Sequence, residues 1–277
     1  MAWSTTIEGV ASHSVDITGV RTHYLEAGSG QPLLLLHGGG AGADSFGNWR
    51  GCLPTLARRA HVYAVDLLGF GRSAKPDPAT YTYTQSGRVD QIIGFIEALG
   101  LREVTLIGNS MGGITSIGVA IERPDLVDRV VLMGSAGVRF APSPELQSIM
   151  NYDFSIEGMR RIVEGLTHPR FAVDQDMVEY RYRLSIEPDT RAAYAAIMGW
   201  LGQQGGLFYD EDYIRRLRKR ALVMHGKLDK VVPLACSYRL LELIDDSFGY
   251  IVPNCGHWAM IEHPRAFTAA VFNFLDT

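Results

Sequence analysis

The chain has 277 residues, of which 47% are hydrophobic and 20% are charged. This is an ordinary globular composition, with ample apolar material for a core. The net charge is −4 and no stretch collects enough Lys and Arg to follow a phosphate backbone, which argues against nucleic acid as a partner.

The cysteines and the N-terminal residues bear on the compartment. Cys52, Cys236 and Cys255 contain no C-x-x-C pair, so they indicate neither a disulfide framework nor a zinc site. The first residues lack a basic patch followed by an apolar core, and no run of about 18 apolar residues could span a bilayer. We therefore expect a cytoplasmic protein for which a membrane is not a partner.

The first half of the chain alternates between strand and helix patterns. A hairpin is predicted over residues 14–27, with its turn near Gly19. Residues 85–99 place an apolar row on one helix face. Short apolar runs predict buried strands over residues 33–36, 61–65, 104–107 and 130–133. Strands and helices in alternation predict an α/β protein with a mostly parallel sheet that helices cover on both faces.

The alternation stops after about residue 137. Residues 138–207 are helical in character and contain no strong strand. The alternation then resumes with predicted strands over residues 221–224 and 248–252, and with predicted helices over residues 234–244 and about 257–275. We expect residues 1–137 and 208–277 to form one α/β core, with residues 138–207 inserted as a helical lid.

The most informative motif is Gly108-Asn109-Ser110-Met111-Gly112, which fits G-x-S-x-G. It directly follows the predicted strand 104–107 and precedes a helical stretch that reaches about Glu122. A serine in such a turn needs small neighbours, and the amides of the following helix can stabilise an oxyanion. An incidental serine in a glycine-rich turn is the alternative, but the flanking strand and helix favour a nucleophile.

A serine hydroxyl needs a base, and the base needs an orienting carboxylate. His257 follows the predicted strand 248–252, and Asp229 follows the predicted strand 221–224. Sites of parallel sheets assemble at these strand ends, and the order Ser110, Asp229, His257 is the expected one. We expect structural or surface roles for five other histidines: His13, His23, His61, His168 and His263.

The loop Asp66–Ser73 contains a rival acid. Asp66 precedes the nucleophile in the chain, so we expect it to shape this turn instead. The same loop contains Gly69-Phe70-Gly71, which lacks the third glycine of a dinucleotide fingerprint, and no G-x-x-x-x-G-K-[ST] occurs in the sequence. A nucleotide is therefore not an expected ligand.

The glycine-rich segment His37–Gly42 ends the predicted strand 33–36. Its backbone amides are free to point inward, so together with the amide of Met111 it can supply two oxyanion donors. His37 could be mistaken for a catalytic base, and we expect it to make a structural hydrogen bond.

With these motifs the sequence resembles the meta-cleavage product hydrolases of bacterial aromatic degradation, over nearly the whole chain. The most specific segments are residues 37–50, 108–113 and 254–263, with Asn109 before the serine and Trp258 after the histidine. Residues 151–154, 204–210 and 243–250 look most like members from carbazole and dioxin-type pathways. The resemblance implies the α/β-hydrolase fold: a mostly parallel eight-stranded sheet, helices on both faces and a helical lid.

The resemblance also implies a reaction. Members hydrolyse a carbon–carbon bond of a 2-hydroxy-6-oxo-6-arylhexa-2,4-dienoate, with no metal or organic cofactor, and are often homodimers. By their places in the family pattern, Ser110, Asp229 and His257 would form the triad. The amides of Gly39 and Met111 would bind the oxyanion. The other implied substrate contacts are Gly38, Gly40, Asn48, Asn109, Arg181 and Trp258.

Some expectations stay open at the level of sequence. Either Arg181 or Arg183 could bind the substrate carboxylate, and Leu228 stands where the family often has an acidic residue. The aryl group would lie against Met150, Phe154, Met198, Trp200 and Trp258, each of which could equally be plain core. An ordinary carboxylesterase with the same triad and a ligand receptor on a hydrolase scaffold are the alternatives, and the set of Asn109, Arg181 and Trp258 argues against an esterase.

Overall fold

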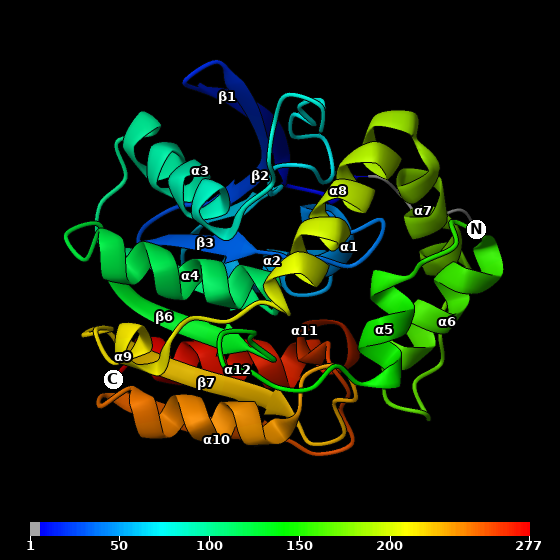
Figure 1. Cartoon of the computed structure of the whole chain (residues 1–277). Helices are drawn as coiled ribbons and strands as arrows, with labels where there is room; N and C mark the ends of the chain where they lie inside the picture. The colour runs from blue at the N-terminus through cyan, green and yellow to red at the C-terminus, as the bar shows by residue number, and fades with distance from the viewer. Residues whose placement is uncertain (1–5) are drawn as a thin grey trace.

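The computed structural model describes residues 6–277, and an eight-stranded sheet forms its centre (Figure 1). The strand order is β1-β2-β4-β3-β5-β6-β7-β8. The strands are β1 (Ala11–Ile17), β2 (Val20–Gly28), β3 (Pro32–Leu36), β4 (His61–Val65), β5 (Val104–Asn109), β6 (Val127–Met133), β7 (Arg220–Gly226) and β8 (Ser247–Val252). The predicted α/β-hydrolase architecture is confirmed.

The pairing of the strands follows from their sequences. β1 and β2 form the predicted antiparallel hairpin around Gly19, and β2 also pairs antiparallel with β4. The remaining neighbours in the sheet, in the order β4-β3-β5-β6-β7-β8, all pair parallel. The central strands are apolar on both sides because helices cover both faces of a parallel sheet, whereas the edge strand β1 is largely exposed.

The helices of the core lie in two layers. α3 (Gln85–Ala98), α4 (Met111–Glu122) and α10 (Leu234–Leu243) pack against one face of the sheet, and Figure 1 shows α12 (Pro264–Leu275) behind β7 on the other. α1 (Ser45–Trp49), α2 (Leu53–Leu56) and α9 (Glu211–Ile214) are short helices that the sequence analysis did not predict. They have too few residues for a helical period to be visible.

Between β6 and α9 the chain forms four longer helices. They are α5 (Pro144–Met150), α6 (Ile156–Leu166), α7 (Gln175–Ile186) and α8 (Pro188–Gln204). Figure 1 shows them grouped beside the carboxyl ends of the strands, on the side to which the arrow of β7 points. The two chain segments that lead into and out of this group meet at Gly137 and Phe208, which form a parallel bridge.

The predicted last helix over residues 257–275 is wrong in its first part. The structure has α11 (Ala259–Glu262) and α12, separated at His263, whose φ of −135° and ψ of 54° are not helical. The reason is Pro264, which disfavours a helical conformation in the residue before it and suits the first turn of a new helix.

Among residues 6–277, no helix is both long and apolar enough to cross a membrane.

Candidate functional site

Ser110 lies in the sharp turn between β5 and α4. Its φ is 55° and its ψ is −112°, a strained backbone conformation for a residue with a side chain. The turn is tight because two glycines are in close contact with backbone: a Cβ on Gly108 would lie 2.3 Å from the Gly112 oxygen, and a Cβ on Gly112 would lie 2.1 Å from the Leu36 oxygen. The G-x-S-x-G pattern therefore has the strand, turn and helix that a nucleophilic serine requires.

His257 and Asp229 come together although 28 residues separate them in the chain. The Nδ1 atom of His257 lies 2.6 Å from Oδ2 of Asp229, and both side chains are buried. His257 is in the loop after β8, and Asp229 is in the loop after β7. Because β7 and β8 are parallel neighbours, these loops leave the sheet at the carboxyl ends of the strands, where Ser110 also lies.

Hydrogen bonds hold Asp229 in its charged form. Its Oδ1 accepts the backbone N–H groups of Val231 and Val232, at 2.8 and 3.0 Å. Burial opposes ionisation, but the neighbouring His257 and the hydrogen bond to it lower the pKa of the Asp229 carboxyl below its ordinary value. A charged carboxylate at Nδ1 leaves Nε2 of His257 as the atom that can take a proton.

The glycine-rich loop lies beside the serine. Gly38, Gly39 and Gly40 line the same cavity as Ser110 and Met111. Met111 is the first residue of α4, where a backbone N–H has no acceptor within the helix and can bind an oxyanion. His37 makes the expected structural bonds, because Nδ1 pairs with the Gly38 oxygen and Nε2 accepts the Leu67 N–H.

The cavity over Ser110 has a volume of about 310 Å³. His257, Trp258, Asn48, Asn109 and Arg181 line it together with the glycine loop. The rest of the wall is mainly apolar and comes from the segments around α5, α8 and the loop after Asp229. Those residues include Val138, Phe140, Leu146, Ile149, Met150, Met198, Leu201, Leu207, Phe208, Val231 and Val232.

Three buried polar side chains in this wall keep atoms that lack a hydrogen-bond partner within residues 6–277. The atoms without a partner are Nδ2 and Oδ1 of Asn48, Oδ1 of Asn109 and Nε of Arg181. Burial lowers the pKa of Arg181 to about 10, so the guanidinium is still a cation at neutral pH. Buried polar groups normally find partners, so these atoms mark one end of the cavity as a binding site for a polar or anionic ligand.

The structure distinguishes the two candidate arginines. Arg181 is buried, donates from Nη2 to the Ala41 oxygen at 2.8 Å and lies 4.9 Å from the ring centre of Trp258. The side chain of Arg183 is 75% exposed and pairs with Glu179. Of these two arginines Arg181 lines the cavity and Arg183 does not; Arg139 is a further lining residue.

Two of the aromatic residues expected around the aryl group lie elsewhere. Phe154 packs against Tyr152 and Tyr194, and Trp200 stacks on the guanidinium of Arg88, so neither lines the cavity. The uneven apolar spacing of residues 138–207 did not show which side of each helix faces the serine. Phe208 and Phe140 line the cavity in their place, and no sequence signal singled them out.

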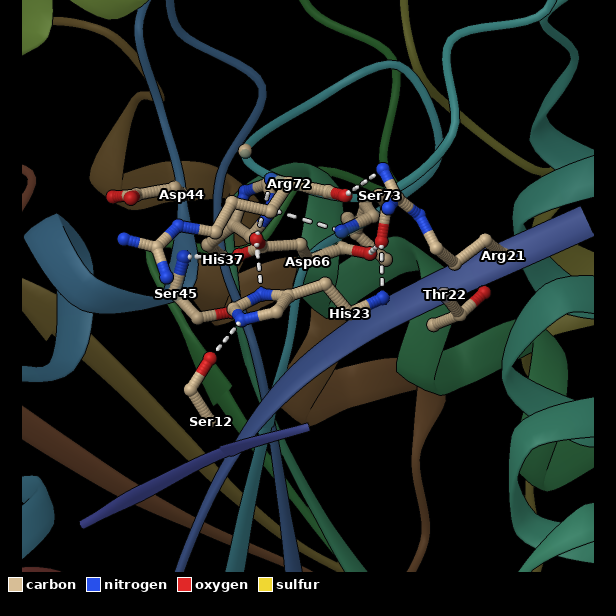
Figure 2. A network of polar contacts seen from close by, with 12 residues as sticks. Ser12, Arg21, Thr22, His23, His37, Asp44, Ser45, Asp66, Arg72 and Ser73 are labelled. Carbon is tan, nitrogen blue, oxygen red and sulfur yellow. Dashed lines mark hydrogen bonds and ion pairs between the residues drawn. The ribbon is translucent and has the colours of Figure 1, made fainter. Parts of the chain in front are cut away.

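Asp66 has the structural role that its loop suggested. Figure 2 shows its carboxylate between the ring of His23 and the backbone of Ser45 and Arg72. His23 Nδ1 lies 2.7 Å from Oδ2, and the Ser45 N–H donates to Oδ1 at 2.7 Å. Burial opposes its ionisation, but His23 lowers the pKa of Asp66 to about 2.

The sequence analysis missed a link between the short helix α1 and α7. Asp44 accepts the Gly47 N–H at the start of α1 and the Tyr180 hydroxyl of α7, the latter at 2.5 Å. Tyr180 directly precedes Arg181, and Asn48 belongs to α1. Asp44 therefore joins the two helices that carry the polar end of the cavity.

Across residues 6–277, no cluster of three His, Cys, Asp or Glu side chains could hold a metal ion.

Comparison with known proteins identifies similar chains of known class. A family model described as alpha/beta hydrolase fold matches residues 31–264. The 2-hydroxy-6-oxo-6-(2'-aminophenyl)hexa-2,4-dienoic acid hydrolase of Metapseudomonas resinovorans is 51% identical, over 95% of this chain and 90% of that protein. A 2-hydroxymuconate semialdehyde hydrolase of Pseudomonas sp. strain CF600 is 38% identical, over 93% of this chain and 91% of that protein.

A solved structure agrees with these relatives. The crystal structure of a serine hydrolase involved in carbazole degradation matches with a TM-score of 0.89 and 48% identity. The match covers 96% of this chain and 99% of that one, so the α/β core and the helices between β6 and β7 are both included.

Proposed function

Because the chain belongs to the meta-cleavage product hydrolases of the α/β-hydrolase superfamily, we propose that it hydrolyses a carbon–carbon bond of a 2-hydroxy-6-oxo-6-arylhexa-2,4-dienoate. The products are an aromatic acid and 2-hydroxypenta-2,4-dienoate, and no cofactor takes part. The proposal depends above all on one observation: polar atoms of Asn48 and Arg181 that have no hydrogen-bond partner among residues 6–277 belong to side chains in the same cavity as Ser110 and His257. A simple ester has no anionic group that requires this buried cation.

The substrate carboxylate and the neighbouring 2-oxygen bind at the polar end of the cavity. Arg181 supplies the charge, and the side chains of Asn48 and Asn109 supply further polar atoms. Gly38, Gly40 and Trp258 complete the contacts. This end favours an anionic form of the dienol. The proton that leaves the 2-hydroxyl is returned at C5 with the help of His257, and this produces the keto form that can be cleaved.

Cleavage then follows a serine mechanism. Ser110 attacks the C6 carbonyl while His257 takes the hydroxyl proton, and Asp229 stabilises the resulting imidazolium. The amides of Gly39 and Met111 receive the developing oxyanion. The bond between C5 and C6 breaks, its electron pair is delocalised toward the 2-oxo group, and His257 returns a proton. Water hydrolyses the acyl-serine and releases the aromatic acid.

The apolar end of the cavity holds the aryl group. Met150, Met198 and Phe208 support this role because they line the cavity as part of a mainly apolar wall that suits a ring. The helices over residues 138–207 act as a lid that keeps bulk water away from the anionic intermediate. The enzyme works in the cytoplasm, and its buried cysteines are free thiols, as a reducing compartment allows.

The protein acts as a homodimer, with the edge strand β8 in the interface. Phe248 and Tyr250 point to the same side of β8 and are 44% and 38% exposed. Large apolar side chains on an open sheet edge are typical of a surface that another chain covers.

The deciding experiment uses the 6-phenyl dienoate and follows the loss of its visible absorbance. The wild type is expected to bleach the substrate and release benzoate, whereas Ser110→Ala is expected to bind it and to cleave it at least about a thousandfold more slowly. A matched control is Ser116→Ala, which changes a buried serine in α4 that bonds to the Gly112 oxygen, away from the cavity.

Two outcomes would contradict the proposal. The first is no bleaching by the wild type together with turnover of a p-nitrophenyl ester, which would indicate an ordinary carboxylesterase. The second is binding of the dienoate without any products, which would indicate a ligand receptor.

A further inference from the structure

His225 is a buried histidine to which the proposed mechanism assigns no role. It lies near the end of β7, with no exposed side-chain surface. Its Nε2 atom lies 3.3 Å from Oδ2 of Asp229, the oxygen that also accepts from His257 at 2.6 Å. Nitrogens of two histidine rings therefore lie near the same carboxylate oxygen of Asp229.

The surroundings of His225 define which nitrogen carries the hydrogen. Nε2 lies 3.0 Å from the carbonyl oxygen of Val232, and a carbonyl oxygen can only accept. Nε2 must therefore be the N–H donor. Nδ1 then has a free lone pair, which accepts from the Ser237 hydroxyl at 2.6 Å. Burial lowers the pKa of His225, so the ring is neutral in this tautomer.

The Nε2–H group of His225 consequently donates to the Val232 oxygen, and Oδ2 of Asp229 lies beside the same nitrogen at 3.3 Å. The Val232 N–H also donates to Oδ1 of Asp229. The backbone of Val232 is therefore hydrogen-bonded to His225 through its oxygen and to Asp229 through its N–H. Other titratable groups near the carboxylate are the thiols of Cys236 on α10 and Cys255. Burial raises the pKa of both thiols, which keeps them neutral.

We infer that His225 is a positioning residue for the triad acid. Its Nε2–H fixes Val232, whose own N–H donates to Asp229, and the positive end of the N–H dipole lies beside Oδ2. This dipole stabilises the negative charge of the carboxylate, which lowers the basicity of His257. The inference rests on the proposed catalytic roles of Ser110, Asp229 and His257, but it does not depend on which acyl group the enzyme transfers.

The test uses His225→Phe and His225→Gln. Phe fills the space without a donor, and the amide nitrogen of Gln can replace the Nε2–H. The rate at which a fluorophosphonate labels Ser110 is measured from pH 5 to pH 9 and compared with kcat/KM for the dienoate. The phosphonate needs only the triad, so this readout stays valid even if the dienoate is not a substrate.

For His225→Phe we expect the acid limb of the labelling profile to move up by about half a pH unit or more, because a more basic carboxylate raises the pKa of His257. His225→Gln should keep the wild-type midpoint. Ser237→Ala, which loosens the ring without removing it, should shift the midpoint in the same direction by less, and it provides the test if the Phe variant does not fold.

A merely structural role would give a different result. The rate of the Phe variant would then fall by the same factor at every pH, in step with its thermal stability, and the midpoint would not move. That outcome, or a Gln variant that behaves like the Phe variant, would overturn the inference. Failure of the wild type to react with the phosphonate would overturn both the triad and this inference, whereas failure to cleave the dienoate alone would overturn only the substrate.

Discussion

At the scale of single residues, the site depends on polar groups that burial makes unusually effective. Arg181 is a cation with little solvent around it, and its Nε atom lacks a hydrogen-bond partner among residues 6–277. A charged hydrogen bond in such surroundings is worth about 1.5–3 kcal/mol. Arg183, two residues further along the same helix, is solvated and already paired with Glu179.

This contrast leads to a prediction about the two arginines. Arg181→Gln should lower kcat/KM for the dienoate by about 10- to 100-fold, mainly through a higher KM, because the substrate carboxylate loses its charged donor. Arg183→Gln is the matched control and should change kcat/KM by less than about twofold. Steady-state kinetics of the two variants would test this, and equal losses in both would contradict the role of Arg181.

At the scale of elements, Asp44 connects α1 and α7 at the polar end of the cavity. Burial and the nearby charge of Asp66 raise the pKa of Asp44 from 3.8 to about 6. Since its pKa is higher in the folded state than in the unfolded state, the folded protein binds more protons between these values. Asp44 therefore costs folding stability progressively as the pH rises from about 4 to about 6, and the cost is constant above that range.

Replacing this carboxylate with an amide should remove the pH dependence. Asp44→Asn keeps an oxygen that can accept the Gly47 N–H, so α1 is still capped. We expect its free energy of unfolding, relative to the wild type, to rise by about 1–3 kcal/mol between pH 4 and pH 6.5 and then stay level. Urea titrations at several pH values measure this difference. A difference that is constant over the range would show that Asp44 is not the group that titrates.

At the scale of the whole molecule, the sheet has two very different edges. β1 at one edge is mainly polar on its exposed side, whereas β8 at the other presents Phe248 and Tyr250. Phe248 is partly held by the ring of Phe274 and by Arg220, so Tyr250 is the cleaner position to change. Neither Phe248 nor Tyr250 lines the cavity over Ser110.

The proposed dimer can be tested by a charge on this edge. Tyr250→Lys should convert a dimer into a monomer at micromolar concentration, because a lysine on an edge strand opposes pairing with another chain. Its kcat/KM should stay within about twofold of the wild type, since Tyr250 does not line the cavity. Ile186→Lys, at an exposed apolar position on α7, is the control. Light scattering after gel filtration gives the mass, and a wild type that elutes as a monomer would refute the dimer.

The sequence by itself determined the core fold and the three residues of the proposed triad, because both are local signals. Short continuous apolar runs identify β3 to β8, and the glycines around Ser110 are required by the turn itself. The carboxyl ends of parallel strands lie on the same side of the sheet, so Asp229 and His257 could be assigned from their places after β7 and β8.

Only the tertiary structure decided which side chains face the cavity from the inserted helices. Residues two apart on a helix point in nearly opposite directions, about 200° apart, so the choice between Arg181 and Arg183 depended on how α7 is rotated against the core. The same holds for Phe154 and Trp200, whose apolar character suits either core or cavity. The contacts of Asp229 with His225, and of Asp44 with Tyr180, join separate segments. No local pattern encodes such contacts, because they arise from packing between elements that are distant in the chain.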